Sequence, residues 1–303
     1  MHKYISIIIS IFIISVAGYI VIHKKQQKQK IKIDRINSIY STNQCGKEGN
    51  FFIPKGILPP VTVDLTQKKY KGIVLYHGEN EVYHPKSWER FEYLSDYVVD
   101  KQGNLYLVPM PFISITKNTF NFLQNLYKLD TDTGELSIFM HFDDIKPSST
   151  NPFGLNAIAH DCNDSTLWVS AIDESDYQVQ RGVIYHIDPK NKKILSEYKG
   201  WDALALTVAF TDKGKILFMG SAKDSGLYIA NIENNIITEP MKLFELPNPE
   251  EHIQKIIIHE NNELEIKTIP FTYTLIAESS EKDGNYYKVI YDKIKNKWNI
   301  EKL

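Results

Sequence analysis

The feature that most constrains the fold is a pattern of four short apolar runs that occurs twice between Gly154 and Glu233. The first copy reads GLNAIAHDCNDSTLWVSAID and GVIYHIDPKNKKILSEYKG, and the second reads LALTVAFTDKGKILFMGSA and GLYIANIENNIITEPMKLFEL. Acidic, Gly, Asn or Lys residues separate the runs, and no run is long enough to form a helix. Four short strands joined by tight turns form a small antiparallel sheet, so each copy predicts one blade of a β-propeller.

Two further markers extend this repeat along the chain. The central apolar residues of the expected second strands recur at intervals of 62, 49 and 48 residues, at Leu105, Leu167, Ile216 and Leu264. An apolar residue followed by an acid ends each expected third strand, at Asp64, Asp130, Asp188, Glu233 and Asp292. Because an Asp side chain can accept hydrogen bonds from backbone N–H groups two residues further on, we predict that these acids close turns.

A repeat of roughly 50 residues fits four-stranded antiparallel blades, since a radial array covers strand edges that a flat sheet would expose. We predict an all-β propeller domain over residues 43–303, with four complete blades and a half-blade over residues 60–78. Six blades are favoured over five. Either residues 43–57 supply the missing strands, or strands from both termini share one blade. A β-sandwich or two small β domains are the alternative folds.

The N-terminus carries an uncharged, Ile-rich run over residues 4–22. As a helix this run spans roughly 28 Å, close to the ~30 Å hydrocarbon core of a bilayer. It is longer than the apolar core of a signal peptide, and its small residues form a poor cleavage site inside the run itself. We therefore predict a single-pass membrane anchor over residues 1–23, followed by a Lys-rich linker over residues 24–42.

The side of the membrane that the domain occupies is less constrained. The Lys residues that follow the span favour the cytoplasm by the positive-inside rule, although long domains are translocated despite flanking charge. Two Cys residues in the chain fit an oxidising compartment. We predict an extracytoplasmic domain at a bacterial envelope. Cys45 and Cys162 would then form a disulfide that pins the N-terminal segment to the third blade, and two unrelated free thiols are the alternative.

The segment NPFGLNAIAHDCNDSTLWVSAID resembles the repeated P-N-G-L-A-x-x-x-D-G-x-L-Y-V-x-D phrase of the SMP-30/gluconolactonase and NHL-type propellers. The resemblance covers blades from about residue 96 to residue 233, and it implies a six-bladed ring. For the enzymatic members it also implies a divalent cation, usually calcium, held at the central channel by Glu, Asn and Asp side chains. Hydrolysis of lactones or related esters is the activity that the resemblance implies.

The residues expected to face the channel do not reproduce that cation site. Counting back from the acid in each first turn reaches Ser95, Asn156, Thr207 and Lys255, and a shift of one residue brings in Asp96. Such a ring offers at most one carboxylate and contains an ammonium group, whereas calcium takes about six to eight oxygen ligands. We therefore expect no catalytic residue, no metal and no cofactor, with calcium bound only under a hydrolase alternative.

The longest expected loops emerge on one face of the propeller, over residues 77–91, 109–125, 143–153, 173–182 and 269–285. Elaboration of one face is typical of a binding surface, because loops on a rigid scaffold often carry function. The candidate residues in these loops and at the blade junctions are His77, His84, Trp88, Phe112, Asn151, Asp173, Trp201 and Asp202. Core packing by the Trp residues and turn capping by Asp202 are the competing structural roles.

These observations favour a binding protein over an enzyme. No nucleophile elbow, phosphate-binding loop or dinucleotide fingerprint occurs in the chain. A net charge of −2 gives no general basic character, so no nucleic-acid partner is expected. The primary hypothesis is a membrane-anchored propeller that binds an unidentified protein or small molecule through its loop-rich face. The alternative is a divalent-metal-dependent lactonase or esterase-type hydrolase.

Overall fold

The computed structural model describes residues 40–41, 45–46, 54–57, 60–65, 69–78, 81–111, 120–211, 214–259, 261–273, 284–292, 294–295 and 297–303. The predicted anchor and nearly all of the predicted linker lie outside these ranges, as does Phe112. Within the ranges described, no helix has the length and apolar character needed to cross a bilayer.

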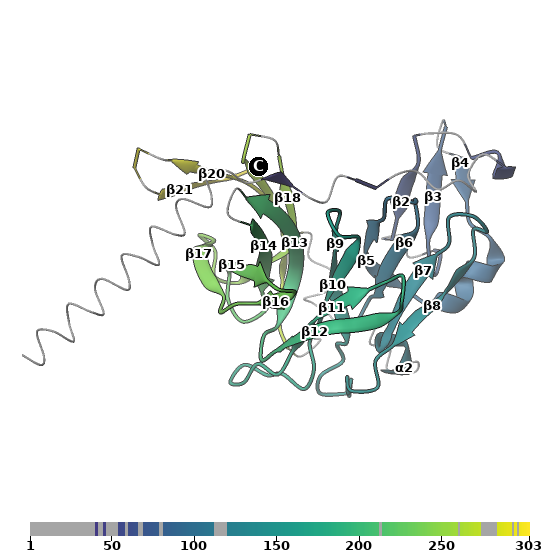
Figure 1. Cartoon of the computed structure of the whole chain (residues 1–303), viewed down its shortest axis with the longest axis horizontal. Helices are drawn as coiled ribbons and strands as arrows, with labels where there is room; N and C mark the ends of the chain where they lie inside the picture. Colours follow the sequence, from purple (N-terminus) through teal and green to yellow (C-terminus); the bar gives the residue numbers. More distant parts are fainter. Residues whose placement is uncertain are drawn as a thin grey trace, which may run out of the picture.

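Antiparallel strands form five sheets, which we call blades I to V in chain order (Figure 1). Blade I contains β2 (Thr62–Asp64), β3 (Val74–His77) and β4 (Glu81–Tyr83). Blade II contains β5 (Leu94–Val99), β6 (Leu105–Pro109), β7 (Asn125–Leu129) and β8 (Leu136–His141). Blade III contains β9 (Leu155–Asp161), β10 (Thr166–Ala171), β11 (Val183–Asp188) and β12 (Lys193–Lys199).

The last two blades follow the same order of strands. Blade IV contains β13 (Ala203–Thr211), β14 (Gly214–Ser221), β15 (Gly226–Glu233), β16 (Ile236–Ile237) and β17 (Met241–Glu245). Blade V contains β18 (Glu251–Ile258), β19 (Leu264–Pro270), β20 (Tyr286–Asp292) and β21 (Lys297–Lys302). A short N-terminal strand, β1 (Tyr40–Ser41), pairs with β13. Two short helices, η2 (Lys86–Phe91) and α2 (Phe120–Leu123), lie in loops.

The preference for six blades is wrong, because five sheets account for every described strand. The expected half-blade is the three-stranded blade I, and the described residues among 43–57 add no strand to it. The two terminal strands also do not share a blade, since β1 joins blade IV and β21 joins blade V. The repeat itself was read correctly, because each predicted four-stranded unit forms one sheet.

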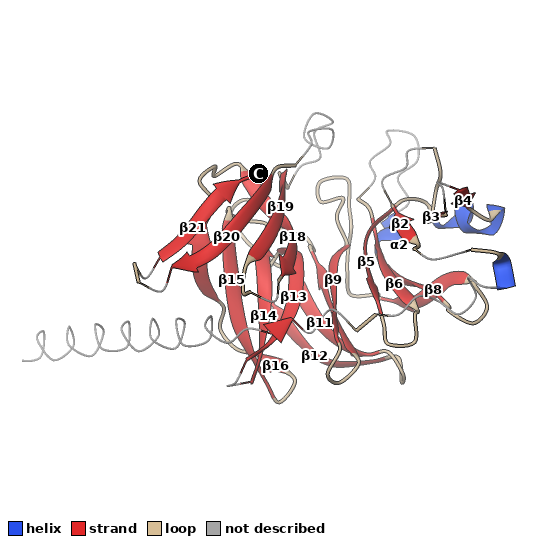
Figure 2. Ribbon diagram, turned by 90° about the horizontal axis from the view of Figure 1, so that it is seen from above, coloured by secondary structure: helices blue, strands red, loops and turns tan. Residues whose placement is uncertain are grey.

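The first strands of blades II to V lie next to one another towards the middle of the molecule, and the later strands lie further out (Figures 1 and 2). Apolar side chains fill the space between successive blades. Trp88 packs between blades I and II, Tyr185 between II and III, Trp168 between III and IV, and Phe218 between IV and V. Among the described residues, no such apolar core joins blade V to blade I.

The burial of the strands reflects this arrangement. Every residue of β10 is buried, and its sequence, TLWVSA, is largely apolar, because blade III has a neighbour on each side. Strand β19 instead alternates between buried and half-buried residues, and its sequence, LEIKTIP, alternates in the same way. Such alternation is typical of a sheet that packs on one face and meets water on the other. Blade V is therefore the outermost blade on its side of the described structure.

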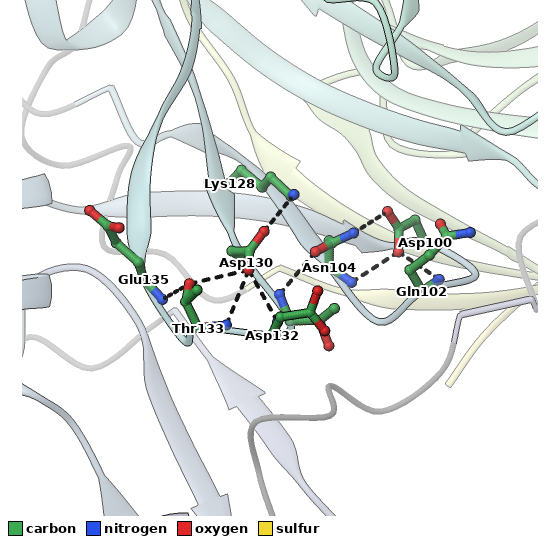
Figure 3. A network of polar contacts seen from close by, with 9 residues as sticks. Asp100, Gln102, Asn104, Lys128, Asp130, Asp132, Thr133 and Glu135 are labelled. Carbon is green, nitrogen blue, oxygen red and sulfur yellow. Dashed lines mark hydrogen bonds and ion pairs between the residues drawn. The ribbon is translucent and has the colours of Figure 1, made fainter.

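Three of the five repeated acids, Asp130, Asp188 and Asp292, close turns as predicted. In blade II, Asp130 Oδ1 accepts hydrogen bonds from the backbone N–H groups of Asp132 and Thr133, each at 3.1 Å (Figure 3). Asp100 Oδ1 accepts from the N–H groups of Gln102 and Asn104, each at 2.9 Å. Asp188 and Asp292 make the same bonds in blades III and V. These carboxylates therefore accept hydrogen bonds within their own turns.

Candidate functional site

The residues predicted to face the channel all lie on the first strands of their blades, with Ser95 and Asp96 on β5, Asn156 on β9, Thr207 on β13 and Lys255 on β18. Asn156 Nδ2 donates a hydrogen bond to Ala203 O at 3.1 Å, and Thr207 Oγ1 donates to Ile256 O at 3.0 Å. In both pairs the acceptor belongs to the first strand of the next blade. These side chains therefore tie neighbouring blades together.

Asp96 makes the corresponding link from blade II to blade III, because its carboxylate accepts a hydrogen bond from the backbone of Ile158. It also accepts from the N–H of Tyr97 at 2.9 Å. Burial raises the pKa of Asp96 to about 6, although the charge of Lys255 and the two backbone hydrogen bonds act in the opposite direction. The fifth residue of the set, Ser95, donates to Pro109 O within its own blade at 2.8 Å.

This set of donors does not fit a calcium ion. It contains a single carboxylate, and the positive charge of Lys255 that acts on this carboxylate would repel a cation. The hydroxyl groups of Ser95 and Thr207 are already engaged with carbonyl oxygens. Within the described ranges, the one group of three metal-ligating side chains is Cys45, His160 and Cys162, at the ring's hairpin end. These five side chains therefore do not form the cation site that the resemblance implies, and Asn156 and Thr207 link neighbouring blades.

Asp202 is the central polar residue of the loop face. Its side chain is fully buried, and Oδ1 accepts hydrogen bonds from Ser175 Oγ at 2.7 Å and from the N–H of Gly182 at 2.9 Å. Its Oδ2 accepts from the hydroxyl of Tyr273 at 2.7 Å. Burial raises the pKa of Asp202, and the three hydrogen bonds partly oppose this rise. One carboxylate thus joins the loops of blades III and V.

Gly182 is required for this contact, because a Cβ at that position would lie 2.2 Å from Asp202 Oδ1. The neighbouring Trp201 packs edge-on against Tyr228, with ring centroids 4.7 Å apart. Trp201 and Asp202, the two residues of the blade III–IV junction, therefore have the packing and capping roles that compete with a binding role. In these roles they also help to shape the loop face.

An apolar cluster lies beside Asp202, and we call it the loop-face cluster. It consists of Phe153, Ile172, Leu204, Ala222 and Tyr273, with Phe271 packed against it. These residues come from the loops and strand ends of blades III to V and from the connection between blades II and III. Because the cluster joins these separate segments, it holds the loop ends in fixed positions. Phe122 does not belong to this cluster and packs on Tyr127 of blade II, with ring centroids 5.0 Å apart.

The segment 173–182 of blade III rests on this cluster. The ring of Tyr177 packs edge-on against Tyr273, with centroids 5.4 Å apart, although Tyr177 remains 61% exposed. Val179, two residues further on, is 44% exposed. The carboxylate of Asp176 closes the turn between them by accepting from the N–H of Gln178 at 2.7 Å and of Val179 at 2.8 Å. Two exposed apolar side chains are therefore held on an ordered loop.

Two of the predicted loop-face residues support the same loop. Asn151 is buried, and its Nδ2 donates to Ser175 O at 2.6 Å. Asp173 Oδ1 accepts from the N–H of Lys146 at 2.6 Å, and burial raises the pKa of Asp173. The structure thus brings Asn151, Asp173 and Asp202 together around segment 173–182.

His77, His84 and Trp88 lie apart from that group, in blade I and its junction with blade II. The expected loop over residues 77–91 is wrong in part, because it contains β4 and η2. His77 ends β3, and His84 Nδ1 lies 2.7 Å from Ile73 O. Trp88 is buried and donates from Nε1 to Gly134 O at 3.2 Å. These side chains serve the core between the two blades.

The opposite end of the ring carries the short hairpins and the disulfide. Cys45 and Cys162 are bonded, with their Cα atoms 5.8 Å apart. Close by, Lys215 Nζ lies 2.7 Å from the buried Oδ2 of Asp161 and also pairs with Asp164, which links blades III and IV. Sequence reasoning missed His160, Ser175, Lys215 and Tyr273. Only His160 had a local signal, its place two residues before Cys162.

Comparison with known proteins gives a likeness of fold. No family model matches the chain, and no curated protein matches it. Similar solved structures include an extracellular domain from B. thetaiotaomicron, with 11% identity, a TM-score of 0.44, and coverage of 77% of this chain and 32% of that one. A gluconolactonase from Xanthomonas campestris has 13% identity, a TM-score of 0.44, and coverage of 69% and 64%.

A glucose dehydrogenase is similar at 12% identity and a TM-score of 0.43, with coverage of 77% of this chain and 76% of that one. The chain spans only about a third of the first of these three proteins and just under two thirds of the second. The resemblance to gluconolactonase-like propellers that the sequence indicates is thus found again among solved structures. The likeness concerns the fold alone and carries no argument about activity.

Proposed function

We propose that this propeller binds a protein partner through segment 173–182 and the loop-face cluster beneath it. The observation that supports this most directly is the exposure of Tyr177 and Val179 on a loop that Asp176, Asp202 and Tyr273 hold in place. Tyr is favoured at interfaces because it offers a large contact area at a low cost in side-chain entropy. A loop ordered before binding also avoids the entropy loss of ordering it in the complex.

The metal-dependent hydrolase is the less favoured alternative. The set of channel candidates contains one carboxylate, Asp96, and the positive charge of Lys255 acts on it. A direct test is thermal unfolding of the full chain in detergent, with added calcium and then with a chelator. We expect the same transition temperature in both. A rise with calcium, together with lactone hydrolysis that the chelator abolishes, would favour the alternative instead.

We also propose that residues 4–22 anchor the chain in a membrane and that the propeller lies outside the cytoplasm. The apolar run supports the first part, and the disulfide supports the second. Reporters fused after Leu303 test this arrangement. Alkaline phosphatase, which needs an oxidising compartment, should be active at that position, and a cytoplasmic fluorescent reporter should be dark. The reverse pattern would place the propeller in the cytoplasm.

Site-specific photo-crosslinking in cells tests the binding proposal. A photoreactive benzoylphenylalanine replaces Tyr177 in one variant and Ile138 in the other. Ile138 is the matched control, since it is 54% exposed but lies on the outer strand β8. We expect a discrete crosslinked protein at position 177 and none at position 138. Equal crosslinking at the two positions, or none at position 177, would contradict a partner on the loop face.

A further inference from the structure

Three metal-ligating side chains meet where the N-terminal segment crosses blade III. Nδ1 of His160 lies 3.6 Å from Sγ of Cys45 and 3.9 Å from Sγ of Cys162. His160 is only 2% exposed and is fixed on strand β9, while Cys162 lies in the turn that follows that strand. The imidazole therefore faces both sulfur atoms of the disulfide.

Cys45 belongs to a segment that connects several blades at the hairpin end of the ring. We call Tyr40, Ser41, Cys45 and Gly46 the strap. Tyr40 and Ser41 pair with β13 of blade IV, and Cys45 is bonded to blade III. Gly46 lies so close to blade II that a Cβ there would be 2.8 Å from the Cβ of Val99. A bond at Cys45 therefore holds the strap in place against blades II, III and IV.

We propose that Cys45, Cys162 and His160 bind one Zn²⁺ ion when the disulfide is reduced. In a reducing environment the zinc ion would then attach the strap to blade III in place of the disulfide. Tetrahedral zinc holds sulfur at about 2.3 Å and imidazole nitrogen at about 2.0–2.1 Å, which places neighbouring ligand atoms roughly 3.5–3.8 Å apart. The two nitrogen–sulfur distances already fall close to this range. Only the two sulfur atoms must separate.

Zinc can bind at this site only after the disulfide has been reduced. A dithiol reductant gives two electrons and two protons to the S–S bond and itself becomes a disulfide, and Cys45 and Cys162 become thiols. Zn²⁺ then replaces the two thiol protons, which pass to solvent, because the thiolate is the form that binds metal. Nδ1 of His160 faces both sulfur atoms and is therefore the imidazole nitrogen that would bind the metal. Water completes the coordination of the ion.

The primary test uses Co²⁺ as a spectroscopic probe of the full chain in detergent. The protein is reduced with a dithiol, desalted without oxygen and titrated with Co²⁺, and the oxidised protein is titrated in parallel. We expect one equivalent of Co²⁺ with thiolate-to-metal charge-transfer bands in the reduced protein only, and displacement of the bound Co²⁺ by Zn²⁺. Equal uptake by the two forms, or none by the reduced form, would overturn the proposal.

Variants identify the ligands. His160→Ala and Cys162→Ser should each weaken Co²⁺ binding at least tenfold. The matched control is His259→Ala, because His259 follows the first strand of blade V and is more exposed. Binding that His160→Ala leaves unchanged would overturn the proposal. If that variant misfolds, X-ray absorption of the reduced wild-type protein with zinc tests the proposal instead. Two sulfur atoms and nitrogen in the coordination shell of the zinc would support the site. A coordination shell without sulfur would overturn it.

Discussion

The two ends of the propeller are closed by different kinds of interaction. At the loop end, the loop-face cluster buries aromatic and aliphatic side chains around the single carboxylate of Asp202. At the hairpin end, the strap is fastened by a disulfide, and Lys215 bridges Asp161 and Asp164 at the blade III–IV junction. The first arrangement depends on burial and hydrogen bonds, and the second on covalent and ionic links.

Under the proposed function, this difference gives the two ends of the scaffold separate tasks. A cluster built from the loops of several blades fixes the positions of those loops while their outer residues remain free to contact a partner. A covalent strap stabilises the blades without offering such a surface. Perturbations of the two ends should therefore differ in size, and only those at the loop end should affect binding.

Removal of the disulfide should give the largest loss of stability. The bond closes a loop with a sequence separation of 117 residues, so the loop-entropy model predicts a loss of about 4–5 kcal/mol for Cys45→Ser with Cys162→Ser. Urea unfolding with a chelator present measures the free energy of unfolding. Crosslinking at position 177 should be unchanged in this variant under folding conditions. A variant as stable as the wild type would show that the strap contributes little.

Asp202→Ala should give the next largest loss, about 3 kcal/mol, because three buried donors lose their acceptor. The same urea unfolding measures it, and crosslinking at position 177 should fall together with stability. Asp176→Ala is the control, since it removes a turn acid from the same loop but leaves the buried network intact. Equal losses in the two variants would contradict the central role of Asp202.

Asp96 should give the smallest effect, and that effect should depend on pH. Its folded pKa of about 6 lies above its ordinary value, so the folded state binds the proton more tightly. The stability from this group is complete below the ordinary pKa and is lost as pH rises through about 6. Compared with Asp96→Asn, the wild type should lose about 1–2 kcal/mol of unfolding free energy between pH 4 and pH 7, a value reduced for solvent screening.

Paired denaturant unfolding curves at pH 4 and pH 7 measure this difference between the wild type and Asp96→Asn. Lys255→Ala offers an independent check, because loss of the positive charge should raise the pKa of Asp96 further. A wild type that gains stability over the variant as pH rises would reverse the sign and contradict the assignment. Neither variant should change crosslinking at position 177.

The repeat was readable from the sequence because turn formation is local. Asp130 and Asp188 bond to N–H groups a few residues away, so the pattern that marks the turn also contains its partners. First strands could be counted in the same way, and Asn156, Thr207 and Lys255 lie on the first strands of their blades. The number of blades was harder to predict, because it depends on how the strands at the two ends of the chain pair. No local pattern indicated that β1 would join β13.

The candidate site could be predicted only in part, because its contacts also join residues that lie far apart in the sequence. Asp202 was identified from its place at a blade junction, but its partners come from two separate loops, and Tyr273 lies far along the chain. The Asn156 and Thr207 side chains were predicted as channel residues, and their bonds to the next blade depend on spacing between strands that a single sequence does not reveal. His160 became notable only once the structure placed Cys45 beside it.

The strap also constrains the order in which the protein is assembled during synthesis. Its residues leave the ribosome before every blade, yet the strand that they pair with and the sulfur that they bond to are made only with blades III and IV. The earliest part of the domain must therefore wait, unpaired, until most of the later blades exist. A chain interrupted before Cys162 would keep a free thiol at Cys45, which would distinguish such unfinished molecules from complete ones.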